Sequence, residues 1–198
     1  MLYLYMLLGV GCSDVEKNDH DHHDHEHEVM TTVALDFTSS SGEAQTFTWA
    51  DPMNDGNPQI DDITLSADES YTLTLSFLNE LEDPAEDITP EIQDEEDMHQ
   101  VFFWGSAVVG PSNLDNADAI IEHAYGDTDA NGNPVGLSND ITTLAAGSGE
   151  LIIALRHMPP EDGQDVKVAD LAATVSESGI ESIGGANDVQ VTFALSVE

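Results

Sequence analysis

Residues 71–77 read Tyr-Thr-Leu-Thr-Leu-Ser-Phe, the cleanest strand pattern in this 198-residue chain. Large apolar side chains alternate with hydroxyl side chains, which is the period of a β-strand with one buried face. The same alternation recurs in residues 31–37, 46–49 and 189–195. The continuous apolar runs 101–104 and 151–155 predict two more strands, buried on both faces.

Clusters of Gly, Asn, Asp, Pro and Ser separate these runs at short intervals, as in proteins built from two packed sheets. We therefore expect an all-β domain over residues 29–198, a two-sheet immunoglobulin-like sandwich. No long amphipathic pattern supports an α/β fold. One short helix is expected around residues 90–98, with Thr89 as N-cap and Pro90 at the first helical position.

The charge balance excludes several classes of partner. The chain has 40 acidic and three basic residues, and its formal net charge is −37. Nucleic acid and anionic lipid headgroups require Lys and Arg to neutralise their phosphates, so this chain would be repelled by both. Its natural small partners are cations. The acidity also fits a saline exterior, where salt screens the self-repulsion of the carboxylates.

The N-terminus predicts export. Residues 1–11 form an uncharged apolar stretch, too short for a permanent transmembrane helix but long enough for a signal peptide. Residues 8–12 (Leu-Gly-Val-Gly-Cys) resemble the lipobox of bacterial lipoproteins, with Gly9 where Leu is commonest. We expect Cys12, the only cysteine, to be lipidated and to anchor the protein in the outer membrane, on its periplasmic or surface face. The alternative is an unlipidated cysteine removed with the signal.

Residues 19–28 contain only histidine and carboxylate side chains. We expect residues 12–28 to be a disordered tether, because this composition cannot bury apolar surface. Neutral imidazoles bind zinc and copper, and the carboxylates add oxygen ligands. The alternatives are an expression tag and a simple spacer. The expected tether ligands are His20, His22, His23, His25 and His27.

A second group of candidate ligands lies in the expected domain. If residues 91–99 are helical, Glu95 and Glu96 lie four and three residues before His99, on one helix face. His157, at the end of a strong strand, is the best candidate for a second imidazole. A single Glu-x-x-His pair is a weak signal. From sequence alone the favoured interpretation is therefore that His157 is a core-edge histidine and His99 starts a strand.

Residues 127–132 (Asp-Thr-Asp-Ala-Asn-Gly) match the opening of a calcium loop, with Asp127, Asp129 and Asn131 as candidate ligands. The bidentate acid expected at the twelfth position is absent, because Ser138 stands there. Asn131-Gly132 is also a type I′ hairpin signal, which favours a turn. Calcium is therefore the secondary interpretation of this loop.

The order of several short segments resembles a family of small lipoproteins of Bacteroidetes and other marine bacteria. Its members join a lipobox and an acidic, often histidine-containing tether to a β-rich domain, and are often labelled type 1 periplasmic-binding-fold superfamily proteins. That fold requires alternating strands and helices, so it is not expected here, and the family supplies no activity to transfer. The matching segments are residues 30–33, 78–80, 87–92, 95–102, 127–136 and 155–157.

These features predict a non-enzymatic cell-envelope lipoprotein that captures divalent metal, with zinc or copper the first choice. No catalytic motif is present, and a metal-uptake transporter of the outer membrane is a sensible partner. The main alternative is an interaction module whose β-sandwich binds a protein or glycan, with the tether as a spacer. A hydrolase that uses paired carboxylates is a third class.

Overall fold

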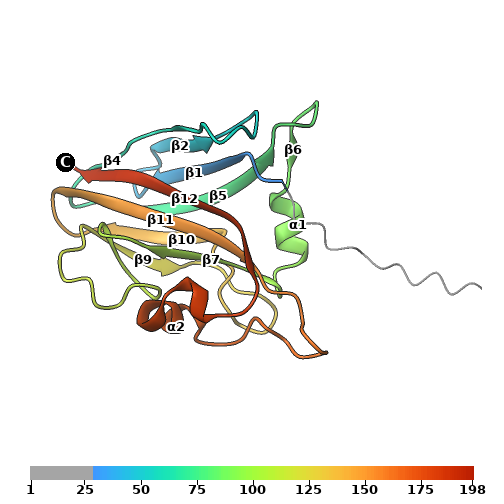
Figure 1. Cartoon of the computed structure of the whole chain (residues 1–198). Coiled ribbons are helices and arrows are strands. Elements are labelled where there is room, and N and C mark those ends of the chain that lie inside the picture. The colour runs from blue at the N-terminus through green and yellow to red at the C-terminus, as the bar shows by residue number, and fades with distance from the viewer. Residues whose placement is uncertain (1–28) are drawn as a thin grey trace, which may run out of the picture.

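The computed structural model describes residues 29–198, which form two β-sheets with two α-helices at their edges (Figure 1). The larger sheet has the strand order β3-β2-β1-β5-β10-β9-β8, with β6 paired to β5. Its neighbours are antiparallel except β8 and β9, which are parallel. Its strands are β1 (Thr32–Ser39), β2 (Ala44–Ala50), β3 (Gln59–Ile60), β5 (Ser70–Asn79), β6 (Glu86–Asp87), β8 (Val108–Val109), β9 (Ile121–Tyr125) and β10 (Ser138–Thr143).

The smaller sheet has the order β4-β12-β11-β7. Its central strands, β11 and β12, are the longest in the domain. They pair antiparallel, and only β4 joins in parallel. Its strands are β4 (Ile63–Leu65), β7 (His99–Trp104), β11 (Gly147–His157) and β12 (Ala186–Val197).

One hydrophobic core lies between the two sheets, as the alternation of apolar residues predicts. In β5, Leu73 and Leu75 are fully buried while Thr72 and Thr74 are exposed. Side chains from the smaller sheet, Ile153 and Phe193 among them, complete the same core. The predicted predominantly β, two-sheet organisation is therefore confirmed.

The apolar run of β7 is buried on both faces, as predicted. Val101 and Phe103 pack into the core between the sheets. Phe102 points to the other side, into a second cluster with Leu171 and Val175 of the helix α2 (Leu171–Ser178). In β11 the burial is less complete, because Ile152 stays partly exposed.

The predicted helix is shorter than expected. α1 spans Thr89–Asp94, so residues 95–98 form a turn and His99 begins a strand. Ile88 is at the N-cap, and Thr89 is instead the first helical residue. The Thr89 hydroxyl accepts a hydrogen bond from the Phe77 backbone N–H (2.9 Å), which ties α1 to β5 and explains why it cannot cap the helix.

A short 3-10 helix (Ile180–Ser182) follows α2, and α2 itself was not predicted from the sequence. Its apolar residues Leu171, Ala172 and Val175 have helical spacing, but only over two turns. Within residues 29–198, no helix is long and apolar enough to cross a membrane.

Candidate metal centre

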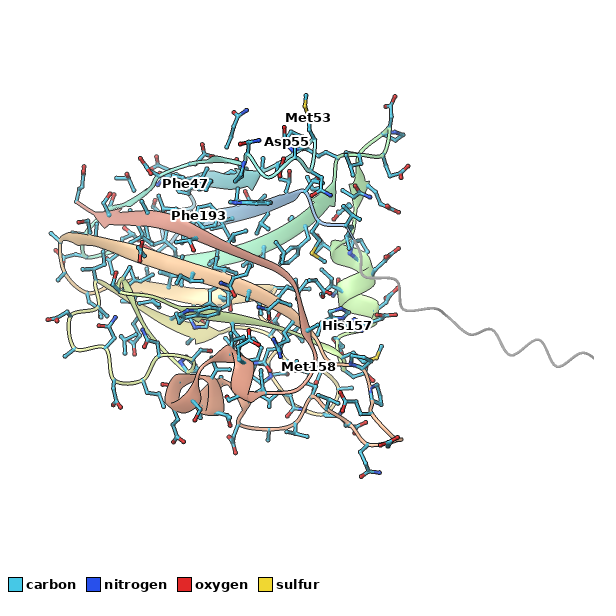
Figure 2. All side chains as sticks on the ribbon, viewed as in Figure 1. Phe47, Met53, Asp55, His157, Met158 and Phe193 are labelled. Carbon is cyan, nitrogen blue, oxygen red and sulfur yellow. The ribbon has the colours of Figure 1, made fainter. Side chains whose placement is uncertain are left out.

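Two histidines face each other at one end of the smaller sheet. β7 begins at His99, β11 ends at His157, and the antiparallel register pairs these two residues directly. Their imidazole rings are stacked, with centroids 4.6 Å apart and planes inclined by 10°. Figure 2 labels His157 on the side of the domain where α1 lies. Strand pairing, rather than a helix face, thus brings the two imidazoles together.

Glu95 joins the histidines from the end of α1, where it is the C-cap residue. The backbone N–H of Met98 donates to the Glu95 carbonyl oxygen (2.9 Å), and the chain turns back there toward β7. Nδ1 of His99 lies 3.1 Å from the same oxygen. A carbonyl oxygen only accepts, so Nδ1 carries the ring proton and Nε2 keeps its lone pair.

One ligand atom from each of Glu95, His99 and His157 lies within 4.8 Å of the other two. Two imidazole nitrogens and a carboxylate oxygen are ligand types that suit zinc and copper. Two ligand atoms bound to one zinc ion, each about 2.1 Å from it, lie at most about 4.2 Å apart. The separation of up to 4.8 Å among these three atoms is close to that limit. The three side chains can therefore form a site of the His₂Glu type.

Asp188 is a fourth polar group at this site, and no sequence motif marked it. The register between β11 and β12 shifts where Leu155 faces Val189 and Arg156 faces Asn187. Asp188 is thus the extra residue of a β-bulge, a feature that redirects a side chain. Its Oδ2 lies 3.8 Å from Nε2 of His99, and the two side chains are only 3% and 5% exposed. A carboxylate facing a ring lone pair favours a cation or a proton between them.

Arg156 holds the chain just before the bulge. Its buried guanidinium donates to the backbone carbonyls of residues 183, 184 and 185, at 2.8, 2.8 and 2.9 Å. Nη1 donates to Oδ1 of Asn187 (2.8 Å). Because Asn187 immediately precedes Asp188, these bonds position the bulge.

The electrostatics of the site favour a neutral imidazole at His99. Burial lowers the pKa of His99, and the carbonyl of Glu95 and the carboxylates of Glu95 and Asp97 oppose this only in part. The ammonium of Lys167 lowers the pKa further. Neutral imidazole is the form that binds metal, so this group is in the ligand form near neutral pH.

Glu96, which the sequence also predicted as a ligand, points to a different place. Its Oε1 accepts a hydrogen bond from the backbone N–H of Ala130 (3.0 Å), and its carbonyl accepts one from Nζ of Lys167 (2.6 Å). A continuous helix would have placed both glutamates beside His99, but α1 ends at Asp94 and the turn at residues 95–98 separates the two side chains. The structure therefore brings Glu95, and not Glu96, to the two histidines.

The loop that opens like a calcium site is held by its own backbone. The carboxylate of Asp127 accepts from the N–H groups of residues 136, 137 and 138, at 2.7, 2.9 and 2.9 Å. Oδ1 of Asp129 accepts from the N–H groups of Asn131 and Asn133, both at 2.9 Å, and Oδ2 lies 3.0 Å from Nζ of Lys167. These contacts favour the turn interpretation. The turn is not type I′, because Gly132 has a positive φ (+85°) but Asn131 does not.

Asp129 and Lys167 form an ion pair whose side chains are both fully buried. Burial on its own would raise the pKa of Asp129, but Lys167 and the two backbone N–H groups hold it below its usual value. The carboxylate of Asp129 thus already has a cationic partner, the ammonium of Lys167.

The remaining predicted groups, His20, His22, His23, His25, His27 and Cys12, lie outside the described residues. Comparisons of the chain with known protein families, with curated proteins and with solved structures find no match. The functional assignment therefore rests on the residues themselves.

Proposed function

We propose that this chain is a non-enzymatic metal-binding lipoprotein of the cell envelope, and that its folded domain binds one zinc or copper ion through His99, His157 and Glu95. The observation that carries the proposal is the convergence of two imidazoles and a carboxylate, with ligand atoms within 4.8 Å of one another. Asp188 supplies a further oxygen beside His99.

The hydrogen bonding of His99 supports a role as ligand. Histidines that bind metal usually donate their second ring N–H to a backbone carbonyl or a carboxylate, which fixes the tautomer. Nδ1 of His99 has this relationship to the carbonyl of Glu95. Nε2, on the side of Asp188, is then the atom that faces the ion.

The distribution of charge also supports a cation as the ligand. The described residues contain two basic side chains, Arg156 and Lys167, and both are buried, with 4% and 3% of their surface exposed. The surface of residues 29–198 therefore offers no Lys or Arg to compete with a cation. A surface that carries many carboxylates and no exposed Lys or Arg raises the local concentration of divalent ions.

The histidine tract and the lipid anchor belong to the same proposal. The tract would gather ions by its density of imidazoles, and the folded site would receive them. Acylation of Cys12 would hold both at the outer membrane, with a metal-uptake transporter as the natural recipient. The proposal also takes the two facing sheets as an immunoglobulin-like sandwich, which the shared core and the mainly antiparallel pairing support.

The neighbouring residues Glu95 and Glu96 provide a matched test. Glu95→Gln removes a proposed ligand, and Glu96→Gln removes the same charge from the adjacent residue, whose carboxylate contacts Ala130. Zinc is titrated by calorimetry into the chain that lacks residues 19–28. We expect Glu95→Gln to weaken binding at least tenfold and Glu96→Gln to change it less than threefold. Equal effects of the two substitutions, or no zinc binding by the parent chain, would refute the folded site.

A further inference from the structure

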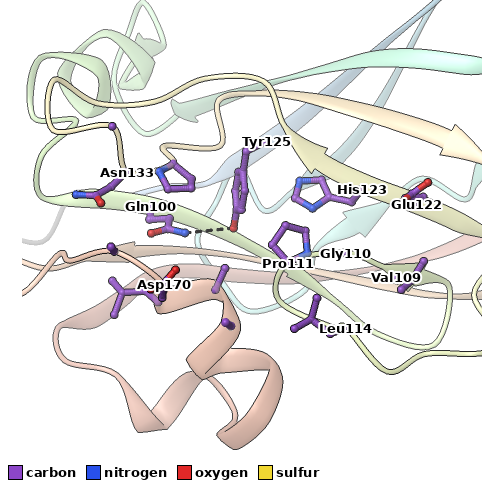
Figure 3. A pocket seen from close by; sticks show the side chains of 16 residues that line it. Gln100, Val109, Gly110, Pro111, Leu114, Glu122, His123, Tyr125, Asn133 and Asp170 are labelled. Carbon is purple, nitrogen blue, oxygen red and sulfur yellow. Dashed lines mark hydrogen bonds between the residues drawn. The ribbon is translucent and has the colours of Figure 1, made fainter.

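A cavity of about 590 Å³ lies between β7, β9, the loop after β8 and the start of α2 (Figure 3). It is separate from the candidate metal centre, because Glu95, His99, His157 and Asp188 do not line it. Its volume is in the range of small-molecule binding sites, which are mostly apolar and largely preformed. The apolar side chains that line it include Val109, Pro111, Leu114, Pro134, Leu171 and Ala172.

Hydrogen bonds hold the loop that forms one wall of the cavity. Nδ2 of Asn113 donates to the backbone carbonyls of Gly105 (2.9 Å) and Val108 (2.7 Å). The backbone N–H of Leu114 donates to Oγ of Ser176 on α2 (2.8 Å), which ties the loop to the opposite wall. The cavity is therefore a preformed feature of the fold, as binding sites for small molecules usually are.

The side chains around the cavity suit an aromatic ligand. The rings of Pro111, His123 and Tyr125 line it (Figure 3). Ring faces of this kind pack well against a further ring. Leu114 lines the same cavity although its side chain is 54% exposed. Contact with an apolar ligand would remove this side chain from water, which favours binding.

Two buried polar side chains of the wall offer nothing to a charged ligand. Nε2 of His123 donates to Oδ1 of Asn139 (3.0 Å), whose Nδ2 donates to the carbonyl of Gly136 (2.8 Å). The amide nitrogen of Gln100 donates to the hydroxyl of Tyr125 (3.3 Å), as Figure 3 shows. The other polar atoms of these two side chains, Nδ1 of His123 and Oε1 of Gln100, are buried in the wall, so they cannot replace the water around an ion. Burial also lowers the pKa of His123 to about 4, so the ring is neutral at physiological pH.

The remaining polar groups of the lining oppose a ligand of either charge. The first N–H groups of α2 repel a cation, because a helix start carries partial positive charge and the N-cap Asp170 makes no side-chain hydrogen bond to them. The carboxylates of Asp170 and Glu122 repel an anion, and the described lining residues include no Lys or Arg. Both acidic residues are exposed, so an ion pair with an ammonium would contribute little. The amide of Asn133 can bond to a neutral polar group.

We propose that this cavity binds a small, uncharged aromatic molecule. The ring of the ligand packs against the side chains of Pro111, Leu114 and Leu171, and the apolar area removed from water supplies the affinity. An uncharged polar group such as a hydroxyl is tolerated beside Asn133. This site is additional to the metal centre and shares no residue with it.

Benzyl alcohol tests the proposal on the full chain, with benzylamine and benzoate as charged probes that carry the same ring. Binding is measured by calorimetry at an ionic strength of about 0.15 M, which screens the attraction of distant carboxylates for the amine. We expect the alcohol to bind with a Kd of about 1 mM or tighter, and both charged probes to bind at least fivefold more weakly. No binding of the alcohol, or a charged probe that binds as tightly as the alcohol, would overturn the assignment.

Two substitutions locate the site. Ala173→Phe fills the cavity from a partly exposed position on α2 and should abolish binding of benzyl alcohol. Its matched control is Thr174→Phe, which places the same side chain at the next, exposed position and should leave the affinity unchanged. Leu114→Ser removes part of the apolar wall and should weaken binding at least threefold. Thermal unfolding verifies that each variant is folded, and unchanged affinity in folded Ala173→Phe or Leu114→Ser would refute the site.

Discussion

The imidazole rings of His99 and His157 are stacked 4.6 Å apart because their residues are directly paired across β7 and β11. These strands are joined through residues 105–146, so nothing in the local sequence marks the two histidines as neighbours. The pair is held by the backbone pairing of two neighbouring strands of the smaller sheet. Such a rigid base suits a site whose ligands must keep their positions.

Asp188 is expected to strengthen metal binding. Its carboxylate lies 3.8 Å from Nε2 of His99, so Asp188→Asn removes a negative charge beside the proposed ion. We predict about a tenfold weaker zinc affinity, the usual effect of losing a group that supports a metal ligand. Calorimetric titration of the chain without residues 19–28 measures it.

The control for Asp188 is Glu181→Gln, which removes an exposed carboxylate from the short 3-10 helix. It lowers the negative charge of the domain by the same amount without touching the site. If the two substitutions weaken zinc equally, the effect of Asp188 is only that of total charge.

The buried His123 is expected to make the free energy of unfolding depend on pH. Its pKa is about 4 in the folded protein, because of burial, and about 6.5 in an unfolded chain. Between these values the unfolded state binds more protons, so the free energy of unfolding falls as the pH falls from about 6.5 to about 4. The group contributes about 3 kcal/mol of this loss.

Urea unfolding at pH values of about 7 and about 4 tests this contribution in the wild-type chain and in His123→Gln. The variant keeps a donor for Asn139 but cannot titrate. We expect its stability to change less between the two pH values than that of the wild type. An identical change in both proteins would show that His123 does not carry the effect.

The buried ion pair of Lys167 and Asp129 is expected to be essential for the 127–138 loop. Lys167→Met leaves a carboxylate with no cation in a place where neither side chain is exposed. We predict a loss of about 3–5 kcal/mol in the free energy of unfolding, measured by urea denaturation. The double variant Lys167→Met/Asp129→Asn should recover much of the loss, since it removes both charges. No recovery would mean that packing, rather than the unpaired charge, causes the loss.

The alternation of apolar residues predicted β1, β2, β5 and β12, and the face of each that enters the core, but not the short strands β3, β4, β6 and β8. In β5, for example, Leu73 and Leu75 lie inward because side chains on a strand have period two. The same rule cannot reveal a bulge. Asp188 reaches His99 because one extra residue interrupts the pairing of β12, and that extra residue leaves no mark in a linear pattern.

The choice between Glu95 and Glu96 shows a second limit of sequence reasoning. Helical spacing places both near His99, but α1 ends at Asp94 and the turn that follows separates their side chains. The bounds of a short helix depend on tertiary contacts, and at the start of α1 the Thr89 hydroxyl accepts a hydrogen bond from Phe77 of β5. The second helix, α2, was missed for a similar reason. Its own apolar pattern covers only two turns, and its apolar residues pack against Phe102 of β7.

A zinc titration by calorimetry tests whether the folded domain holds its own metal ion. The chain without residues 19–28 is compared with the same chain carrying His99→Ala and His157→Ala. We predict one tight zinc site in the first protein and none in the second, with additional weaker sites when residues 19–28 are present. Equal binding by the first two proteins, or binding only when residues 19–28 are present, would contradict it.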